Sequence, residues 1–169
     1  MRISIVAARD NNNGIGKDGM IPWTCPEDMR HFSRLTKSGK SNAVIMGRAT
    51  FSSIGSPLPG RANVVISSTI KQEAAQGYYL CQSYEEGLRC CEELGVQAVW
   101  ICGGERIYDA ALRCKSVDKC YLTDIDGSWS CDRHFPELDA AIWQEESVLK
   151  LSKIATLRVF CPKRKEDCQ

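Results

Sequence analysis

The sequence has no excess of charge of either sign. Its 169 residues include 22 basic and 21 acidic side chains, which leaves a formal net charge of +1. Proteins that bind nucleic acid or anionic membranes usually carry a basic patch, and a chain this balanced gives little field to attract them. We therefore expect neither nucleic acid nor a membrane surface as a partner.

Long hydrophobic runs are also missing. The longest apolar segments fall far short of the roughly 20 residues that a transmembrane helix needs, and the first residues, MRIS, lead into a strand pattern rather than a signal peptide. A chain of this length can bury a full core as one domain. We expect a single domain over residues 1–169.

Metal-binding motifs are absent, although the chain has ten cysteines. No two cysteines have CxxC spacing, and only His31 and His134 could add imidazole ligands. Several cysteines lie within apolar runs, where a free cysteine acts as a small hydrophobic residue. We therefore predict reduced thiols, a cytoplasmic protein and no metal site.

What the sequence does contain is an alternation of short apolar runs with helical patterns. Strands are predicted at 3–8, 43–46, 63–66, 77–81, 98–102 and 117–125, with a closing hairpin at 143–149 and 154–160. Helices follow the first, second, fourth and fifth strands, and residues 9–19 and 126–136 are predicted as loops. This order predicts an α/β fold whose mainly parallel central sheet is flanked by helices and ends in an antiparallel hairpin.

The stretch IPWTCPEDMRHF, residues 21–32, is the first candidate for chemistry. Thr24 and Glu27 have capping-box spacing, so we predict that Thr24 caps a helix. Helical spacing places Asp28 on an apolar face, and the opposite, solvated face would carry Glu27, Arg30, His31 and Arg34. A carboxylate that faces apolar surface needs a partner, and that partner can be a ligand. The simpler alternative is that Asp28 caps its own helix.

Polar residues and glycines gather where the predicted strands end, which is where ligands bind in parallel sheets. Gly47-Arg48-Ala49-Thr50 leads from a strand into a helix whose N-terminus could hold a phosphate. Gly103-Gly104 would let a ligand approach the backbone, although Glu105 would repel a nearby phosphate. We expect these segments, Ser67-Ser68 and Thr123 to converge on one cleft with Asp28. Residues 9–19 are either a lid over it or an ordinary surface loop.

Five segments together resemble the dihydrofolate reductases, in the same order and essentially from end to end. They are GIGKDGMIPW, PEDMRHFSRLT, VIMGRATFSSIGSPLPGRANVVISS, ICGGERIYDAAL and YLTDIDGSWSCDRHFP. The resemblance implies reduction of 7,8-dihydrofolate to tetrahydrofolate by NADPH, with hydride passing from nicotinamide C4 to pterin C6 and a proton reaching N5. It also implies a place in one-carbon metabolism and thymidylate synthesis, sensitivity to antifolates, and a monomer.

The resemblance also implies roles for residues on the substrate side. Asp28 would hold the pterin amino and amide groups, Thr123 would bond to Asp28, and Trp23 would help order a water, with Ile21 beside them. Arg61 would pair with the glutamate α-carboxylate of folate, where its fork suits a carboxylate; without the resemblance it would read as a turn-closing surface arginine. The folate cleft would be lined by Val6, Ala7, Ile21, Met29, Phe32, Ile54, Leu58 and Cys102.

The cofactor would occupy the remaining strand ends. Its implied binding residues are Ala7, Ile15, Gly16, Gly47, Arg48, Ala49, Thr50, Ser67, Ser68, Cys102, Gly103, Gly104, Glu105 and Tyr108. The peptide between Gly103 and Gly104 would be cis. Three positions differ from the best-known members of that family. Arg48 is the one evident cation for the 2′-phosphate. Met29 stands where vertebrate members have a phenylalanine, and Cys102 stands where an aliphatic residue is usual.

Two other functions compete with this one. A reductase of another pterin or of a flavin precursor could use the same fold, but Arg61 within PLPGR favours folate. A cofactor-binding module without catalysis is a different class, and the joint presence of Asp28, Trp23 and Thr123 argues against it.

Overall fold

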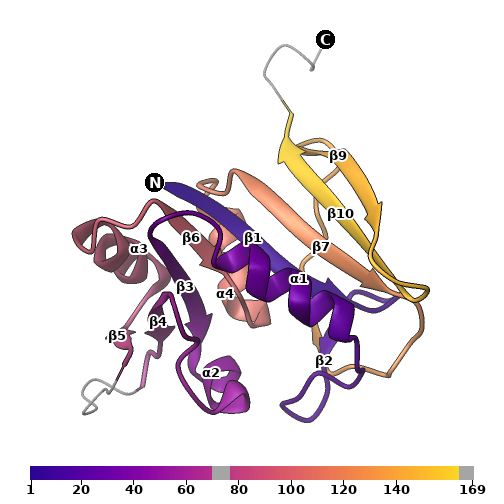
Figure 1. The fold of residues 1–169 in the computed structure, drawn as a ribbon, viewed down its shortest axis with the longest axis horizontal. Coiled ribbons are helices and arrows are strands. Elements are labelled where there is room, and N and C mark those ends of the chain that lie inside the picture. The colour runs from indigo at the N-terminus through magenta and orange to yellow at the C-terminus, as the bar shows by residue number, and fades with distance from the viewer. Residues whose placement is uncertain (70–76, 164–169) are drawn as a thin grey trace.

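The computed structural model describes residues 1–69 and 77–163. Eight strands form one sheet in the order β5-β4-β3-β6-β1-β7-β10-β9 (Figure 1). The strands are β1 Arg2–Arg9, β3 Asn42–Gly47, β4 Ala62–Ile66, β5 Tyr79–Cys81, β6 Ala98–Ile101, β7 Lys119–Ile125, β9 Trp143–Lys150 and β10 Ala155–Pro162. The helices are α1 Pro26–Thr36, α2 Arg48–Ile54, α3 Tyr84–Glu93 and α4 Glu105–Arg113.

The sheet is parallel from β5 to β7, and β10 runs antiparallel to both β7 and β9. This confirms the predicted α/β class with its C-terminal antiparallel hairpin. The central strands consist of nearly continuous apolar runs because both of their faces are covered by helices. In β3, for example, residues 42–46 are all buried.

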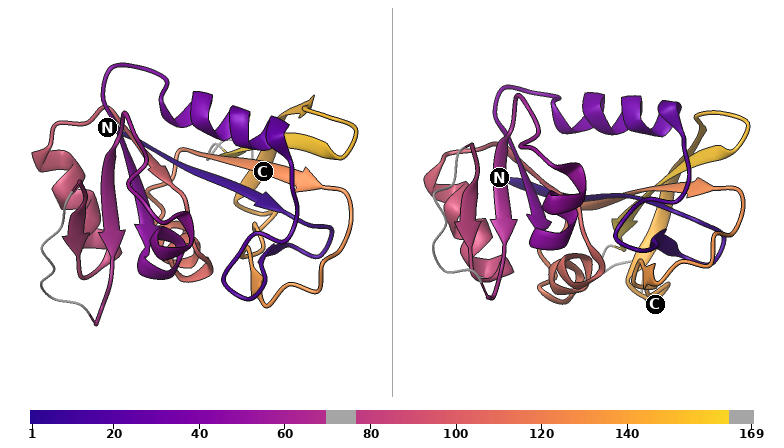
Figure 2. Two further views of the ribbon diagram at one scale, coloured as in Figure 1. Left: turned by 60° about the horizontal axis from the view of Figure 1, so that its bottom comes forward. Right: turned by 90° about the horizontal axis from the view of Figure 1, so that it is seen from below.

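Helices cover the two faces of the sheet in pairs. One core cluster joins Val6, Val44 and Trp100 to Phe51 of α2, with Phe32 of α1 against it. The other core cluster lies beneath α3 and α4. The view from below in Figure 2 shows α1 and α4 on opposite sides of the sheet. The α1 helix therefore crosses the strands on a face that it shares with α2.

The start of α1 differs from the predicted capping box. Pro26 is the first helical residue, Cys25 takes the N-cap position without a side-chain cap, and Thr24 is exposed. Glu27 pairs with Arg30 at 3.5 Å instead of reaching back to the N-terminus. Proline is well suited to the first helical position, so it sets the start one residue later than Thr24 would have done.

Two side chains lie on the wrong side of the predicted helix faces. His31, predicted to be solvated, is only 9% exposed, and Leu94, which shares the helical spacing of Leu88 and Cys91 and is expected to be buried with them, is 37% exposed. The helical period identifies two faces but not how much of each face a distant segment covers. Ser83 and Glu86 also have capping-box spacing, which predicts a helix start at Ser83. This prediction is confirmed on the Ser83 side, since Ser83 Oγ accepts from the backbone N–H of Glu86 at 3.1 Å.

Residues 9–19 are more ordered than the predicted loop. They contain β2, Gly14–Gly16, which pairs antiparallel with β8, Arg133–His134. Asp10 organises the segment, because its carboxylate accepts from the backbone N–H groups of Asn12 at 2.9 Å, Gly14 at 2.7 Å and Trp129 at 3.1 Å. Burial acts to raise the pKa of Asp10, but these donors and Cys131 outweigh it and hold that pKa below its ordinary value.

No helix within residues 1–69 and 77–163 is long and apolar enough to span a membrane. The nine cysteines among these residues are free thiols, and the same residues contain no His, Cys, Asp and Glu cluster that could hold a metal ion.

Candidate active site

Asp28 lies in the first turn of α1 and faces the sheet. Its carboxylate accepts a hydrogen bond from the hydroxyl of Thr123, which is 2% exposed on β7. Thr123 lies opposite Ala8 of the neighbouring strand β1. Burial raises the pKa of Asp28 above its ordinary value, while the hydrogen bond from Thr123 and the charge of His31 act in the opposite direction. The structure therefore brings together these two residues of the predicted site.

Trp23, which precedes α1, packs against a second tryptophan. Its ring centroid lies 5.2 Å from that of Trp129, with the planes at 57°. Both indoles pack against a small core cluster that includes Cys25 and Ile125. Trp129 was not predicted from the sequence, because its contact depends on a loop that lies far along the chain.

Large apolar side chains remain exposed on the segments that carry the predicted substrate residues. Ile21 is 54% exposed, Met29 is 56% exposed and Ile54 is 41% exposed. Phe32 and Leu58 are half-buried, and Val6 and Ala7 are buried. Exposed apolar surface of this kind is available for a ligand to cover.

Arg61 is tied to the far end of α1. Its Nη1 donates to Thr36 Oγ1 at 2.6 Å, its Nε donates to Pro59 O at 3.2 Å, and its guanidinium lies 5.9 Å from the ring centroid of Phe32. Burial lowers the pKa of Arg61 from its ordinary value. Arg61 therefore closes its own turn, which is the role expected of it without the resemblance. It also contacts the helix that bears Asp28.

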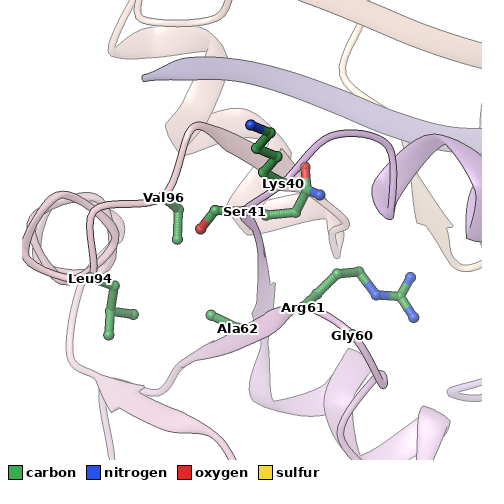
Figure 3. A pocket seen from close by; sticks show the side chains of 8 residues that line it. Lys40, Ser41, Gly60, Arg61, Ala62, Leu94 and Val96 are labelled. Carbon is green, nitrogen blue, oxygen red and sulfur yellow. The ribbon is translucent and has the colours of Figure 1, made fainter.

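A shallow cavity of about 290 Å³ adjoins Arg61 on the other side. Figure 3 shows the guanidinium of Arg61 pointing away from this cavity, whose walls include Leu94 and Val96. Lys40, Ser41 and Ala62 place the cavity at the amino ends of β3 and β4. Since ligands of parallel sheets bind at the carboxyl ends, we do not assign this cavity to the site.

Two helix N-termini meet at the carboxyl ends of β3 and β6. The backbone N–H of Gly47 donates to Gly103 O at 2.7 Å, and the Gly103-Gly104 peptide is cis, as the resemblance implied. Gly47 is the N-cap of α2 and Gly104 is the N-cap of α4, and neither helix has a side-chain cap. The N–H groups at a helix start carry partial positive charge and can receive an anion.

Gly103 also has a packing role that the sequence did not reveal. Its φ is +100°, and a Cβ at this position would lie 2.9 Å from the ring of Tyr108. Tyr108 is 4% exposed and donates its hydroxyl to Val6 O at 3.0 Å, and burial raises its pKa well above the ordinary value. Gly103 therefore admits the tyrosine ring that joins α4 to β1.

Arg48 begins α2 and reaches towards β5. Its Nη1 donates to Tyr78 Oη at 3.2 Å, and its guanidinium lies 5.9 Å from the ring centroid of Phe51. The neighbouring strand β4 is followed by Ser67, which is 6% exposed, and by Ser68, which is exposed. Sequence reasoning missed Tyr78, because nothing in the run 77–81 indicates which of its side chains faces Arg48.

The remaining predicted cofactor residues lie on the same segments. Cys102 follows β6, its Sγ donates to Trp100 O at 3.4 Å, and burial raises its thiol pKa to about 12. Thr50 lies close to Gly104, since a Cβ on Gly104 would be 3.3 Å from Thr50 Oγ1. The other members are Ala49 on α2, Glu105 on α4, and Ile15 and Gly16 on β2. A lid role for residues 9–19 stays a prediction.

Comparisons with known proteins agree with this arrangement. The dihydrofolate reductase family model matches residues 2–156. A dihydrofolate reductase type 3 of Salmonella typhimurium is 45% identical over 148 residues, which cover 86% of this chain and 85% of that protein. The dihydrofolate reductase of Bacillus subtilis is 39% identical over 142 residues, covering 84% and 80%, and that of Drosophila melanogaster is 34% identical over 147 residues, covering 82% and 81%.

Proposed function

The chain belongs to the dihydrofolate reductase family, and from that premise we propose how its residues carry out the reaction. The protein is an NADPH-dependent oxidoreductase that reduces dihydrofolate to tetrahydrofolate. Our proposal assigns the individual residues. It rests above all on Asp28, a half-buried carboxyl hydrogen-bonded to Thr123 on the sheet-facing side of α1.

Asp28 is proposed to recognise the pterin ring. An ionised carboxylate only accepts hydrogen bonds, so it can take one from the amino group and one from the ring N–H of the substrate. Its negative charge favours protonation at N5, the position that must gain a proton during the reduction. Thr123 orients the carboxylate, and Trp23, fixed against Trp129, is proposed to hold the water through which the proton moves.

The exposed apolar side chains and Arg61 are proposed to bind the rest of the substrate. The aromatic ring of folate would cover Ile21, Met29 and Ile54, which are now exposed to solvent. Arg61 lies at the far end of α1 from Asp28, which suits a substrate with a pterin at one end and a carboxylate at the other. Its planar fork can take that carboxylate bidentately.

The residues at the two helix N-termini fit NADPH. The uncapped starts of α2 and α4 offer donors to the pyrophosphate, and Arg48 offers a cation to the 2′-phosphate. When bound there, NADPH would supply the hydride from nicotinamide C4. Cys102 and Ala7 would lie against the nicotinamide, and burial keeps the Cys102 thiol protonated, so it adds no charge to the pocket.

The assignment is tested by replacing Asp28 with asparagine and following NADPH absorbance with and without dihydrofolate. Asp28→Asn should fold and bind NADPH normally but lose turnover by orders of magnitude at neutral pH, because the charge that favours N5 protonation is gone. Activity should partly return in acid, where solvent can protonate the substrate. Asp126→Asn, at an exposed loop position, is the matched control.

Wild-type turnover in Asp28→Asn at neutral pH would overturn the role of Asp28. Other dihydropterins, and a flavin precursor, serve as substrates that lack the glutamate tail. If they are reduced as fast as dihydrofolate, Arg61 does not select folate. We also propose that the chain acts as one domain, as a monomer and in the cytoplasm, and light scattering in solution tests the monomer.

A further inference from the structure

His31 is a buried imidazole without a visible partner. It is 9% exposed, and within the described part of the chain neither Nδ1 nor Nε2 has a hydrogen-bond partner. Buried polar atoms are rarely left unsatisfied, because the lost hydration costs free energy. A cavity of about 280 Å³ adjoins the ring, lined by Glu27, Arg30, Arg34 and Leu151 besides His31 itself. The imidazole thus forms part of the cavity wall while both of its nitrogens stay buried.

The imidazole lies one helical turn from the carboxyl assigned to catalysis. His31 and Asp28 are three residues apart on α1, a spacing that makes side chains neighbours on a helix. Their charges act on each other: Asp28 raises the pKa of His31, and His31 lowers the pKa of Asp28. A buried pair interacts more strongly than an exposed one, because little solvent screens it.

The other elements around His31 add little charge of their own. On α1, Arg34 lowers the pKa of His31, while Glu27 and Arg30 pair with each other at 3.5 Å. The β9–β10 connection contributes Leu151 to the cavity wall, and β7 contributes the uncharged Thr123 beside Asp28. Glu27 also lines the cavity but is paired with Arg30, and Asp28 is the acidic group that raises the pKa of His31.

We propose that His31 is a positioning residue for the reduction: its imidazole, one turn after Asp28 on α1 and in the wall of the cavity, sets how readily Asp28 takes up a proton. The inference rests on the proposed function, because it needs Asp28 to be the carboxylate that serves the substrate. His31 thereby adds a second ionising group to the site, one turn from Asp28 on α1.

The direction of the effect follows from the charges. Burial is the largest influence on His31 and lowers its pKa below 6.5, so the ring is neutral at pH 7. As the pH falls through that lowered pKa, the ring becomes cationic and lowers the pKa of Asp28. The wild-type protein should therefore keep Asp28 ionised to a lower pH than a variant with an uncharged residue at position 31.

The coupling can be measured without substrate by NMR titration of the imidazole protons. The chain has two histidines, and the exposed His134 is an internal control in the same spectrum. Asp28→Asn should lower the pKa of His31, because the neighbouring anion is removed, and Arg34→Gln should raise it, because a neighbouring cation is removed. Neither substitution should affect the NMR signals of His134. An unchanged His31 titration in Asp28→Asn would overturn the inference.

The consequence for activity is read from the pH profile of kcat/KM with dihydrofolate and NADPH. His31→Gln should move the acid limb of the profile to higher pH, and His134→Gln should leave it in place. If His31→Gln lowers only thermal stability and leaves the shape of the profile unchanged, His31 is a packing residue and the inference fails.

His31→Asn serves as a second uncharged variant should His31→Gln fold poorly. A protein that shows coupled titration yet does not reduce dihydrofolate would refute the proposed function, and with it this role of His31. Loss of the coupling alone would refute only the present inference.

Discussion

Arg48 is the residue on which the choice of cofactor is expected to depend. Its guanidinium is held between the Phe51 ring and the Tyr78 hydroxyl at 3.2 Å, so it is oriented before any ligand binds. A hydrogen bond to a charged group contributes about 1.5–3 kcal/mol, which is roughly tenfold to a hundredfold in affinity. Arg48→Ala should therefore weaken NADPH binding by about that factor and leave NADH nearly unchanged.

The measurement is the dissociation constant of each cofactor, by quenching of tryptophan fluorescence. Arg113→Ala, at an exposed position at the C-terminal end of α4, is the control for loss of one positive charge. Tyr78→Phe keeps the charge but removes one orienting contact, so its effect should be smaller than that of Arg48→Ala. If NADPH and NADH weaken equally, Arg48 serves the shared pyrophosphate or the fold instead.

Single residues show where sequence reasoning stops. The residue pattern alone placed Asp28 and Thr123 at one cleft, and the bond between them was implied by the resemblance to the dihydrofolate reductases. His31 and Tyr78 could not be predicted. Their surroundings depend on segments distant in sequence, such as the β9–β10 connection over His31, and helical period or strand alternation carries no information about these.

At the scale of elements, Asp10 is expected to hold the segment with β2 in place. Its carboxylate is 4% exposed and accepts from three backbone N–H groups on two separate loops. Asp10→Asn replaces one acceptor oxygen with a donor and removes the charge. The free energy of unfolding at pH 7 should fall by about 1.5–3 kcal/mol, the usual value for hydrogen bonds to a charged group.

The pH dependence of this effect has a definite sign. The pKa of Asp10 is lower in the folded protein than its ordinary value of 3.8, so its stabilisation is present above that value. This stabilisation is lost as the pH falls through the lowered pKa of Asp10. The difference in free energy of unfolding between wild type and Asp10→Asn should therefore shrink in that pH range. Urea unfolding at pH 7 and at pH 3 measures this difference in free energy, with Asp126→Asn as the control. A difference that is equal at both pH values would contradict this account.

Elements were predictable in proportion to the apolar surface they bury. The central strands form continuous apolar runs because the sheet is covered on both faces, and their positions followed from the sequence to within a few residues. β2 and β8 could not be found in this way. They bury little, and they are set by the polar side chain of Asp10 and by a close approach of Gly14 to Cys131, at which a Cβ would lie 2.6 Å from Sγ.

At the scale of the whole molecule, the class of fold was predictable and the strand order was not. Alternating strands and helices require a largely parallel sheet, since a crossover helix returns the chain to the same edge. The placement of β6 between β3 and β1 depends on side-chain packing over both faces. It is this placement that brings Gly103 of the β6–α4 connection against Gly47 of the β3–α2 connection.

The cysteines distributed over the molecule provide a test of the folded state and of the cofactor site together. Cys91 and Cys120 are fully buried, and burial raises each thiol pKa to about 12, so both should react with a thiol reagent only when the protein unfolds. Cys114 is exposed and should react first. Cys102 has the same high pKa but is half-buried at the proposed nicotinamide pocket, so slow labelling is expected in the free protein.

NADPH should slow the labelling of Cys102 several-fold and leave that of Cys114 unchanged, because a ligand over β6 covers the one thiol and not the other. Mass spectrometry of peptides from timed reactions measures each site in one sample. Protection of all thiols alike would show that NADPH only stabilises the fold, since the buried Cys91 and Cys120 would then slow in parallel with Cys102. Equal labelling of Cys102 with and without NADPH would remove it from the cofactor site and leave Arg48 and the two helix N-termini to define that site.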